Sequence, residues 1–215
     1  MTLKTAGDFP VYFARHGETT YNRENRVQGW QDSSLTESGR KQAQEIAVIL
    51  RDFVSTNDAP RFVCSPLGRT RHTMEIVLGV LGLPTDHYTS DERLLEVDYG
   101  EWSGRYIPDI ETNDRERWEA RERDKWNVPA PGGESYAAVA LRASSWFSDL
   151  RHETVAIGHG AFGRILRGLY QGLSWQEMAT MDEPQGVVFR FQQGTIARIE
   201  PPLAVAPFDD PAPGP

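Results

Sequence analysis

A chain of 215 residues, 39% of them hydrophobic, is long enough to bury one sizeable core, so a single domain is expected rather than two small ones. The net charge of −8 argues against a general nucleic-acid surface, because binding to a phosphate backbone needs a concentrated basic face. A single cysteine, Cys64, excludes an intramolecular disulfide framework and is typical of a reducing compartment.

The amino-terminal segment around Lys4 and Asp8 lacks the apolar stretch of a secretory signal. No apolar run reaches the length that a membrane-spanning helix needs. We therefore expect a cytoplasmic protein with neither membrane nor nucleic-acid partners. Nothing in the pattern specifies an oligomeric state.

Apolar strand-like runs alternate with helical patterns along the chain. The predicted strands cover residues 11–14, 61–65, 154–158 and 187–191. Helices are predicted after the N-cap Thr36, over residues 135–150, and after Gly160 with a stop at Gly172. This alternation predicts an α/β protein of three layers, α/β/α, around a mostly parallel central sheet.

Two further segments differ in composition from this core. Residues 104–130 carry alternating charges, which predicts an inserted helical flap. The aromatic residues in and before this stretch either pack the flap onto the core or contact a substrate; they are Tyr99, Trp102, Tyr106, Trp118 and Trp126. Recurrent prolines from Pro201 disfavour regular structure, so we expect one domain over residues 1–200 and a proline-rich tail over 201–215.

The most informative feature is the first apolar run, which leads directly into Arg15, His16 and Gly17. A buried strand that ends by presenting an arginine, a histidine and a flexible glycine is a natural place to hold an anion beside a nucleophile. The segment therefore predicts one half of a phosphate-binding site.

A second strand end supplies another histidine. Residues 154–158 lead into His159 and Gly160 at the start of a predicted helix. Because ligands bind at the carboxyl ends of strands in open α/β folds, we expect both histidines to face one crevice. The backbone N–H groups that open the helix after Gly160 add a partial positive charge suited to an anion.

Two more segments offer groups for phosphoryl chemistry. After residues 61–65, either Arg69 or Arg71 can supply a second guanidinium, and spacing alone does not choose between them. Glu96 lies among apolar and aromatic neighbours, which favours a role in donating protons. Asp98 and Glu101 lie close by, so a merely structural ion pair of Glu96 is the alternative.

These four segments, in this order, resemble the histidine phosphatase superfamily, also called phosphoglycerate mutase-like, over about residues 11–191. The resemblance places the family's second arginine on Arg69, its acid on Glu96 and its second histidine on His159. The remaining matches are Arg15, His16, Gly17, Glu18, Thr19, Asn22, Leu35, Thr36, Gly39, Gln42 and the run 131–135.

The resemblance implies a catalytic role for five residues. His16 would be the nucleophile that becomes transiently phosphorylated, while Arg15, Arg69 and His159 hold the phosphoryl group. Glu96 would protonate the leaving oxygen and then help water to attack the phosphohistidine. A metal or other cofactor is not expected, since two arginines and a protonated second histidine can stabilise the charge on the phosphoryl group.

Three further residues complete the predicted substrate-binding set. Asn22 would assist in holding the phosphoryl group by resemblance, and Gln28 lies in the same loop region. Either side chain serves equally well to shape the loop. Gly160 is included for its backbone N–H at the predicted helix start.

Four positions bear on the reaction class. Thr70 and Gly158 replace an alanine and a serine that are frequent in the family, and we expect these changes to touch substrate preference rather than the reaction. Val97 stands where cofactor-dependent mutases typically have arginine, which disfavours mutase activity. Cys64 fails as the nucleophile of a cysteine phosphatase, because that motif needs an arginine where Thr70 stands.

The sequence thus predicts a metal-independent phosphomonoester hydrolase that acts on a small phosphorylated metabolite through a phosphohistidine. A phosphomutase is the alternative within the same enzyme class. A phospho-ligand binding module without turnover is the alternative outside it, although pure binding would need neither a nucleophile nor an acid.

Overall fold

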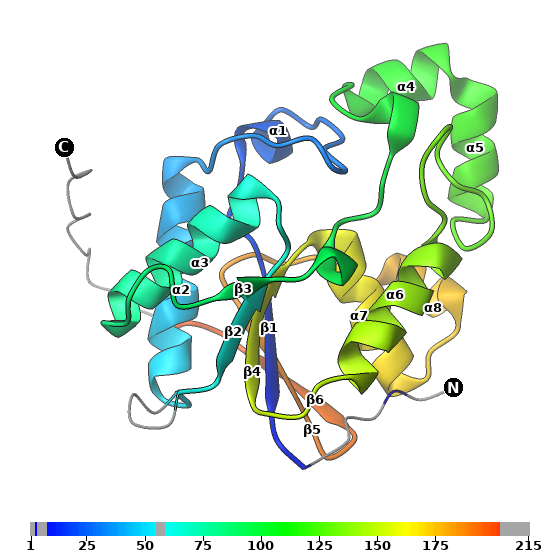
Figure 1. Ribbon diagram of the computed structural model, residues 1–215. Coiled ribbons are helices and arrows are strands. Elements are labelled where there is room, and N and C mark those ends of the chain that lie inside the picture. Colours follow the sequence, from blue (N-terminus) through cyan, green and yellow to red (C-terminus); the bar gives the residue numbers. More distant parts are fainter. Residues whose placement is uncertain (1–2, 4–7, 55–58, 203–215) are drawn as a thin grey trace.

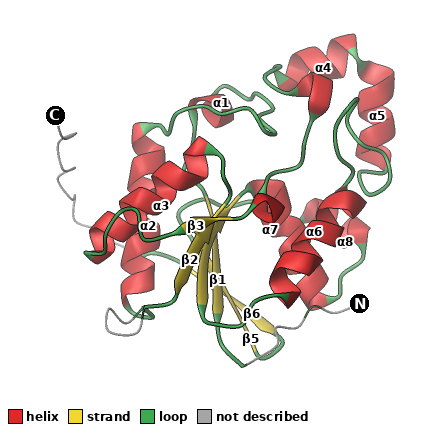
Figure 2. Ribbon diagram, in the orientation of Figure 1, coloured by secondary structure: helices red, strands yellow, loops and turns green. Residues whose placement is uncertain are grey.

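The fold is built on one six-stranded sheet. A computed structural model describes residue 3 and residues 8–54 and 59–202. The strands run in the order β3-β2-β4-β1-β5-β6 (Figure 2). Their bounds are β1 Val11–Arg15, β2 Arg61–Cys64, β3 Thr89–Ser90, β4 Thr154–Gly158, β5 Val188–Gln192 and β6 Thr195–Ile199. Strands β3, β2, β4 and β1 pair in parallel, whereas β5 and β6 are antiparallel, so the mostly parallel sheet is confirmed.

Helices cover both faces of this sheet. Their bounds are α1 Thr20–Arg23, α2 Glu37–Arg51, α3 Gly68–Leu81, α4 Ile107–Asn113, α5 Arg115–Arg123, α6 Tyr136–Ser148, α7 Gly160–Gln171 and α8 Trp175–Thr180. Helices α2 and α3 lie on one face, and α6 and α7 lie on the other (Figure 1). The predicted three-layer architecture is therefore confirmed. Within the described ranges no helix has the length and apolar character to cross a membrane.

Alternate residues of β1 show how the two layers are filled. Val11 and Phe13 belong to the apolar cluster that includes α6 and α7, while Tyr12 and Ala14 belong to the cluster with α2 and α3. A strand buried on both faces reads as a continuous apolar run rather than an alternating one. This is why the strand signals in the sequence were clear.

The predicted helix ends also agree with the structure. Thr36 caps α2 by accepting a hydrogen bond from the Gly39 amide at 3.0 Å, and Gly172 ends α7 with a left-handed φ of 70°. Helix α3 was not predicted, because the polar Arg69, Thr70 and Thr73 on its inner side are buried. Such residues break the apolar pattern on which sequence analysis relies.

Two helices, α4 and α5, occupy the stretch predicted as a flap and extend away from the sheet (Figure 1). A small apolar cluster of Val27, Trp102, Ile110 and Ala130 anchors them to the core side. The Trp102 indole donates a hydrogen bond to Asp114 at 2.7 Å. Most of the predicted proline-rich tail, from residue 203 on, lies outside the described residues.

Candidate active site

The carboxyl ends of β1 and β4 bring two histidines together. Arg15 and Gly158 are register partners at the last step of this parallel pair, so His16 and His159 follow side by side. The two imidazole centroids lie 5.3 Å apart. The predicted juxtaposition of the two histidines is thus present in the structure.

Arg69 links the two imidazoles. Its Nε donates to Nε2 of His16 at 3.1 Å, and its Nη2 lies 3.1 Å from Nδ1 of His159. Asp32 holds the same guanidinium through Nη1 at 3.1 Å and also accepts from the backbone N–H groups of Gly68 and Arg69 at the start of α3. Arg71, the alternative left open by spacing, is exposed.

These contacts define the tautomer of each histidine. Nδ1 of His16 lies 2.7 Å from the Gly17 carbonyl oxygen, which only accepts, so Nδ1 carries the proton and Nε2 keeps its lone pair. Arg69 only donates, so Nδ1 of His159 is an acceptor and Nε2 carries the proton. That buried Nε2–H has no partner among the described residues. One imidazole is therefore arranged as a nucleophile and the other as a donor.

The fold disfavours the charged form of both histidines in the unliganded site. Burial, then the charges of Arg69 and Arg15, lowers the pKa of His16 well below its ordinary value. Burial, then Arg69, lowers the pKa of His159 in the same way. The protonated His159 expected during phosphoryl transfer concerns the state with a bound anion and stays a prediction. A bound phosphoryl dianion would favour protonation again.

Acidification should destabilise the protein through these two histidines. Their pKa values are depressed in the fold, so below the unfolded value of about 6.5 the unfolded chain binds more protons. The histidine contribution to stability is thus present above pH about 6.5 and is lost as the pH falls. The free energy of unfolding, measured with urea, falls as the pH is lowered from about 6.5 to 5, and His159→Gln should reduce this fall by about 1 kcal/mol per pH unit. The variant His87→Gln, at an exposed position, is the control. If the free energy of unfolding depends equally on pH in the wild type and both variants, the prediction is contradicted.

The loop after β1 is braced against α2. A Cβ on Gly17 would lie 2.1 Å from the Gly39 carbonyl oxygen, so glycine is required for this close approach. The Glu18 amide donates to Gln42 at 2.7 Å, and the Thr36 hydroxyl donates to the Glu18 carboxylate at 2.6 Å. The residues of the opening motif beyond His16 therefore fix its position.

Glu96 occupies the amino-terminal end of α7. Its carboxylate accepts hydrogen bonds from the backbone N–H groups of Ala161 at 3.2 Å and Phe162 at 3.0 Å. The N–H groups expected to bind a substrate anion are thus taken by Glu96. Gly160 lies outside the cavity lining, and its predicted role in substrate binding has no support from the geometry.

A cavity of about 320 Å³ opens between these strand ends and the flap. Of the predicted site residues, those that line it are Arg15, His16, Asn22, Gln28, Arg69 and Glu96. His159 is fully buried and does not line the cavity. It contacts Arg69, which does. Lining residues that the sequence analysis did not assign are Arg26, Val27, Gly29, Ile107, Arg121, Glu122, Lys125, Tyr136, Arg164 and Glu183, while Tyr99 and Trp118 come from the aromatic stretch left open.

Glu183 is the missed residue nearest to the predicted chemistry. Arg15 donates to its backbone carbonyl at 2.6 Å and lies 3.9 Å from its carboxylate. Arg164 pairs with the same carboxylate at 2.7 Å. Glu183 lies 168 residues from Arg15 in the sequence and belongs to no motif, so only the fold could reveal this contact.

Asn22 and Gln28 line the cavity but also shape its loop. Oδ1 of Asn22 accepts from the Thr19 amide at 3.2 Å and from the Gln185 side chain at 3.3 Å. The Gln28 amide nitrogen donates to the Thr19 hydroxyl at 2.6 Å, and its oxygen accepts from Ser33 at 3.2 Å. Both ends of Gln28 are therefore engaged within the loop.

The two departures from the family pattern do not face the cavity. Thr70 is buried, and its hydroxyl donates to the carbonyls of Ser65 and Leu67 at 2.7 Å. A Cβ on Gly158 would lie 2.6 Å from the Phe13 ring. The expectation that Thr70 and Gly158 tune substrate preference is therefore corrected: both serve backbone and core packing.

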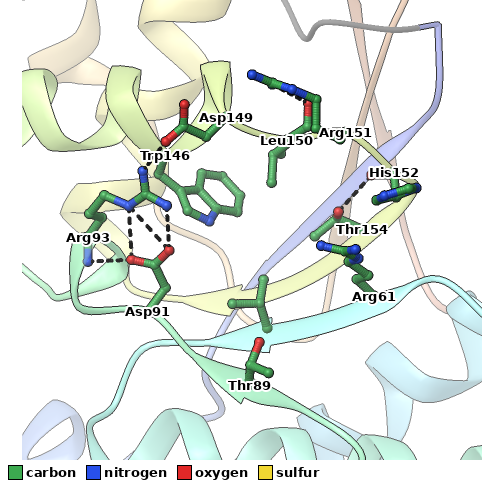
Figure 3. A pocket seen from close by; sticks show the side chains of 11 residues that line it. Arg61, Thr89, Asp91, Arg93, Trp146, Asp149, Leu150, Arg151, His152 and Thr154 are labelled. Atoms are coloured by element: carbon green, nitrogen blue, oxygen red, sulfur yellow. Dashed lines mark hydrogen bonds and ion pairs between the residues drawn. The ribbon is translucent and has the colours of Figure 1, made fainter.

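A second cavity, of about 180 Å³, lies at the opposite, amino-terminal ends of β2 and β4 (Figure 3). Its Arg93 is held between Asp91 at 2.8 Å and Asp149 at 2.7 Å. The exposed His152 is at its rim, and neither predicted histidine of the site contributes. The residues predicted for phosphoryl chemistry therefore belong to the larger cavity.

Together, a mostly parallel α/β fold and two adjacent imidazoles beside two guanidinium groups are typical of proteins that bind phosphoryl groups. The family model of the histidine phosphatase superfamily (branch 1) matches residues 11–196, and the chain belongs to this superfamily.

Relatives of both reaction types are similar to the chain. A 2,3-bisphosphoglycerate-dependent phosphoglycerate mutase of Chelativorans sp. (strain BNC1) is 30% identical over 207 residues, which cover 91% of this chain and 95% of the relative. The structure of a putative alpha-ribazole-5'-P phosphatase from Escherichia coli has a TM-score of 0.76 at 22% identity, covering 94% of this chain and all of that one. A mycobacterial glucosyl-3-phosphoglycerate phosphatase has a TM-score of 0.71 at 24% identity, covering 90% and 98%. At these identities the two structures show the fold alone.

Proposed function

We propose that the protein hydrolyses phosphomonoesters of small metabolites, without a metal, through a phosphohistidine on His16. The observation that carries the proposal is the orientation of His16: its proton is fixed on Nδ1 by the Gly17 carbonyl, and its unprotonated Nε2, which accepts from Arg69, lies at a cavity wall. A neutral imidazole held in this way is an activated nucleophile.

The first half-reaction transfers the phosphoryl group to the enzyme. Arg15 and Arg69 bind the phosphoryl oxygens, and Arg69 moves its Nε–H bond from His16 to one of them. The buried Nε2–H of His159 has to become accessible from the cavity before it can join them, as the resemblance implies. Nε2 of His16 then attacks phosphorus. The bond from phosphorus to the leaving oxygen breaks, its electron pair stays on that oxygen, and Glu96 supplies the proton.

The second half-reaction restores the enzyme. The Glu96 carboxylate takes a proton from water as the water oxygen attacks phosphorus. The bond from phosphorus to Nε2 breaks, its electron pair returns to His16, and inorganic phosphate leaves. Splitting the hydrolysis in this way replaces one difficult displacement by two easier ones.

Hydrolysis is preferred over mutase activity because of Val97. Its side chain is fully buried in the core, so the position after the acid offers the cavity no cation. A phosphomutase is the second candidate, favoured by the names of relatives at about 30% identity. A binding module is disfavoured, since the chain retains both the nucleophile His16 and the acid Glu96.

The test is the release of inorganic phosphate from a panel of phosphomonoesters with EDTA present throughout. We expect turnover at undiminished rate in EDTA, with water as the phosphoryl acceptor. Transfer to phosphoglycerate much faster than phosphate release would make the protein a mutase. Binding of phosphate without either reaction would make it a binding module.

A further inference from the structure

The second cavity, at the amino-terminal ends of β2 and β4, contains a buried indole with an unmade hydrogen bond. Trp146 of α6 lines this cavity and is 1% exposed. Its indole nitrogen points into the cavity (Figure 3), and no hydrogen bond joins it to another described residue. Trp102, which is also fully buried, donates to Asp114 at 2.7 Å. A buried indole N–H ordinarily has an acceptor, and it can only donate, so Trp146 requires an acceptor atom from a ligand.

The wall opposite the indole supplies further donors. Arg61 at the start of β2 and His152 in the turn before β4 lie across the cavity from Trp146 (Figure 3). Arg61 is the register partner of Thr154, so the two adjacent strands bring Arg61 and His152 together. The Arg61 guanidinium has no hydrogen-bond or ion-pair partner among the described side chains, and it only donates. Donors from two walls therefore face one space.

The carboxylates of the lining do not cancel this positive charge. Asp91 and Asp149 both pair with Arg93, at 2.8 and 2.7 Å, and their carboxylates face that guanidinium (Figure 3). Within a chain of net charge −8, the lining has two carboxylates and three arginines, the other two being Arg61 and Arg151. The charge of Arg61 is thus left without a counter-ion, which favours an anion in the cavity.

We propose that this cavity binds a small tetrahedral oxyanion, of the size and charge of inorganic phosphate, between Trp146 and Arg61. Donors on opposite walls fit oxygens that point in several directions, whereas the two oxygens of a carboxylate lie in one plane on one side. The volume of about 180 Å³ admits such an ion together with water, whose share of liquid volume is about 30 Å³. None of the lining residues lines the larger cavity, so the inference does not depend on hydrolysis.

The test follows the indole N–H of Trp146 by ¹H–¹⁵N NMR while inorganic phosphate replaces chloride at constant ionic strength. Trp146→Phe assigns the resonance among those of the six tryptophans. We expect this resonance to shift to saturation. Arg61→Met should raise the Kd for phosphate at least about tenfold, and Arg61→Lys should fall between, because it keeps the charge but not the fork. Arg71→Met, exposed on α3 and outside the cavity, is the control and should leave the Kd unchanged.

Three results would overturn the inference. If the shift does not saturate, only water meets the indole. If acetate saturates the shift at a lower concentration than phosphate, the site prefers a planar carboxylate. If Arg61→Met, shown to be folded by a thermal melt, keeps the wild-type Kd, the donors are not those assigned.

Phosphate in the larger cavity is recognised by a variant of its own. Arg15→Met alters that cavity alone, so the Trp146 titration should persist in it. A titration that is lost in Arg15→Met and kept in Arg61→Met would assign the shift to an ion beside His16 and overturn the second site. The readout needs no turnover, so failure of the proposed function and failure of this inference are distinguishable.

Discussion

Replacing His16 by alanine should lower kcat for phosphomonoester hydrolysis by at least about a thousandfold. Removing Nε2 removes the atom that accepts the phosphoryl group, and the described structure places the other imidazole, that of His159, with its lone pair on Arg69 rather than toward the cavity. The measurement is steady-state phosphate release in EDTA, with the exposed His87→Ala as a control that should retain wild-type activity.

The same variant tests the covalent intermediate. Acid-quenched wild-type enzyme should carry one phosphoryl group on the peptide that contains His16, and the variant should carry none. Because His16→Ala leaves the Nε of Arg69 without its acceptor, a thermal melt must show that the variant is folded. Hydrolysis at an unchanged rate by a folded His16→Ala protein would refute the mechanism.

The parts of the site that sequence analysis predicted are those that follow apolar strands. Arg15, His16 and His159 stand directly after buried runs, and a parallel sheet necessarily brings such ends to one edge. The helix after Thr36 was predicted for a similar reason, since its cap and its apolar face are both local in the sequence. Local patterns therefore sufficed for the central layer and the phosphoryl pocket.

The surroundings of His159 in the unliganded site could not be predicted from any local pattern. A histidine near an anion site is expected to be charged, but the fold inserts Arg69 between the two imidazoles and buries all three groups. Similarly, the N–H groups at the amino-terminal end of α7 were predicted to bind the substrate, whereas they donate to the carboxylate of Glu96. Both cases concern which charged group occupies a given position, and this depends on tertiary contacts.

The flap was predicted as helical, but its contribution to the site was not. Arg121 belongs to a run of alternating charges that is typical of a solvated helix, yet it is buried between two tyrosines. One of these, Tyr136, comes from the start of α6, beyond the flap. Burial of a charged residue among aromatic rings from separate segments has no sequence signature of its own.

Replacing Glu96 by glutamine should affect substrates according to their leaving groups. An alkyl phosphate needs protonation of its leaving oxygen, so kcat/KM for glycerol 3-phosphate should fall by about 10²- to 10⁴-fold. An activated aryl phosphate such as 4-nitrophenyl phosphate departs without a proton, and its kcat/KM should fall by less than about tenfold. The ratio kcat/KM is the proper measure, because it reports the first half-reaction even where water attack limits kcat.

The glutamine variant preserves part of the geometry at this position. Its single side-chain oxygen can keep one of the two N–H bonds that hold Glu96, which reach Oε2 from Ala161 and Oε1 from Phe162, while its NH2 group cannot accept the other, so a thermal melt must show that the variant is folded. Glu183→Gln is the matched control, since that acid also lines the cavity but pairs with Arg15 and Arg164. If Glu183→Gln gives the leaving-group-dependent loss and Glu96→Gln does not, the acid is Glu183. If Glu96→Gln lowers both substrates equally, Glu96 positions the phosphoryl group or the water and donates no proton.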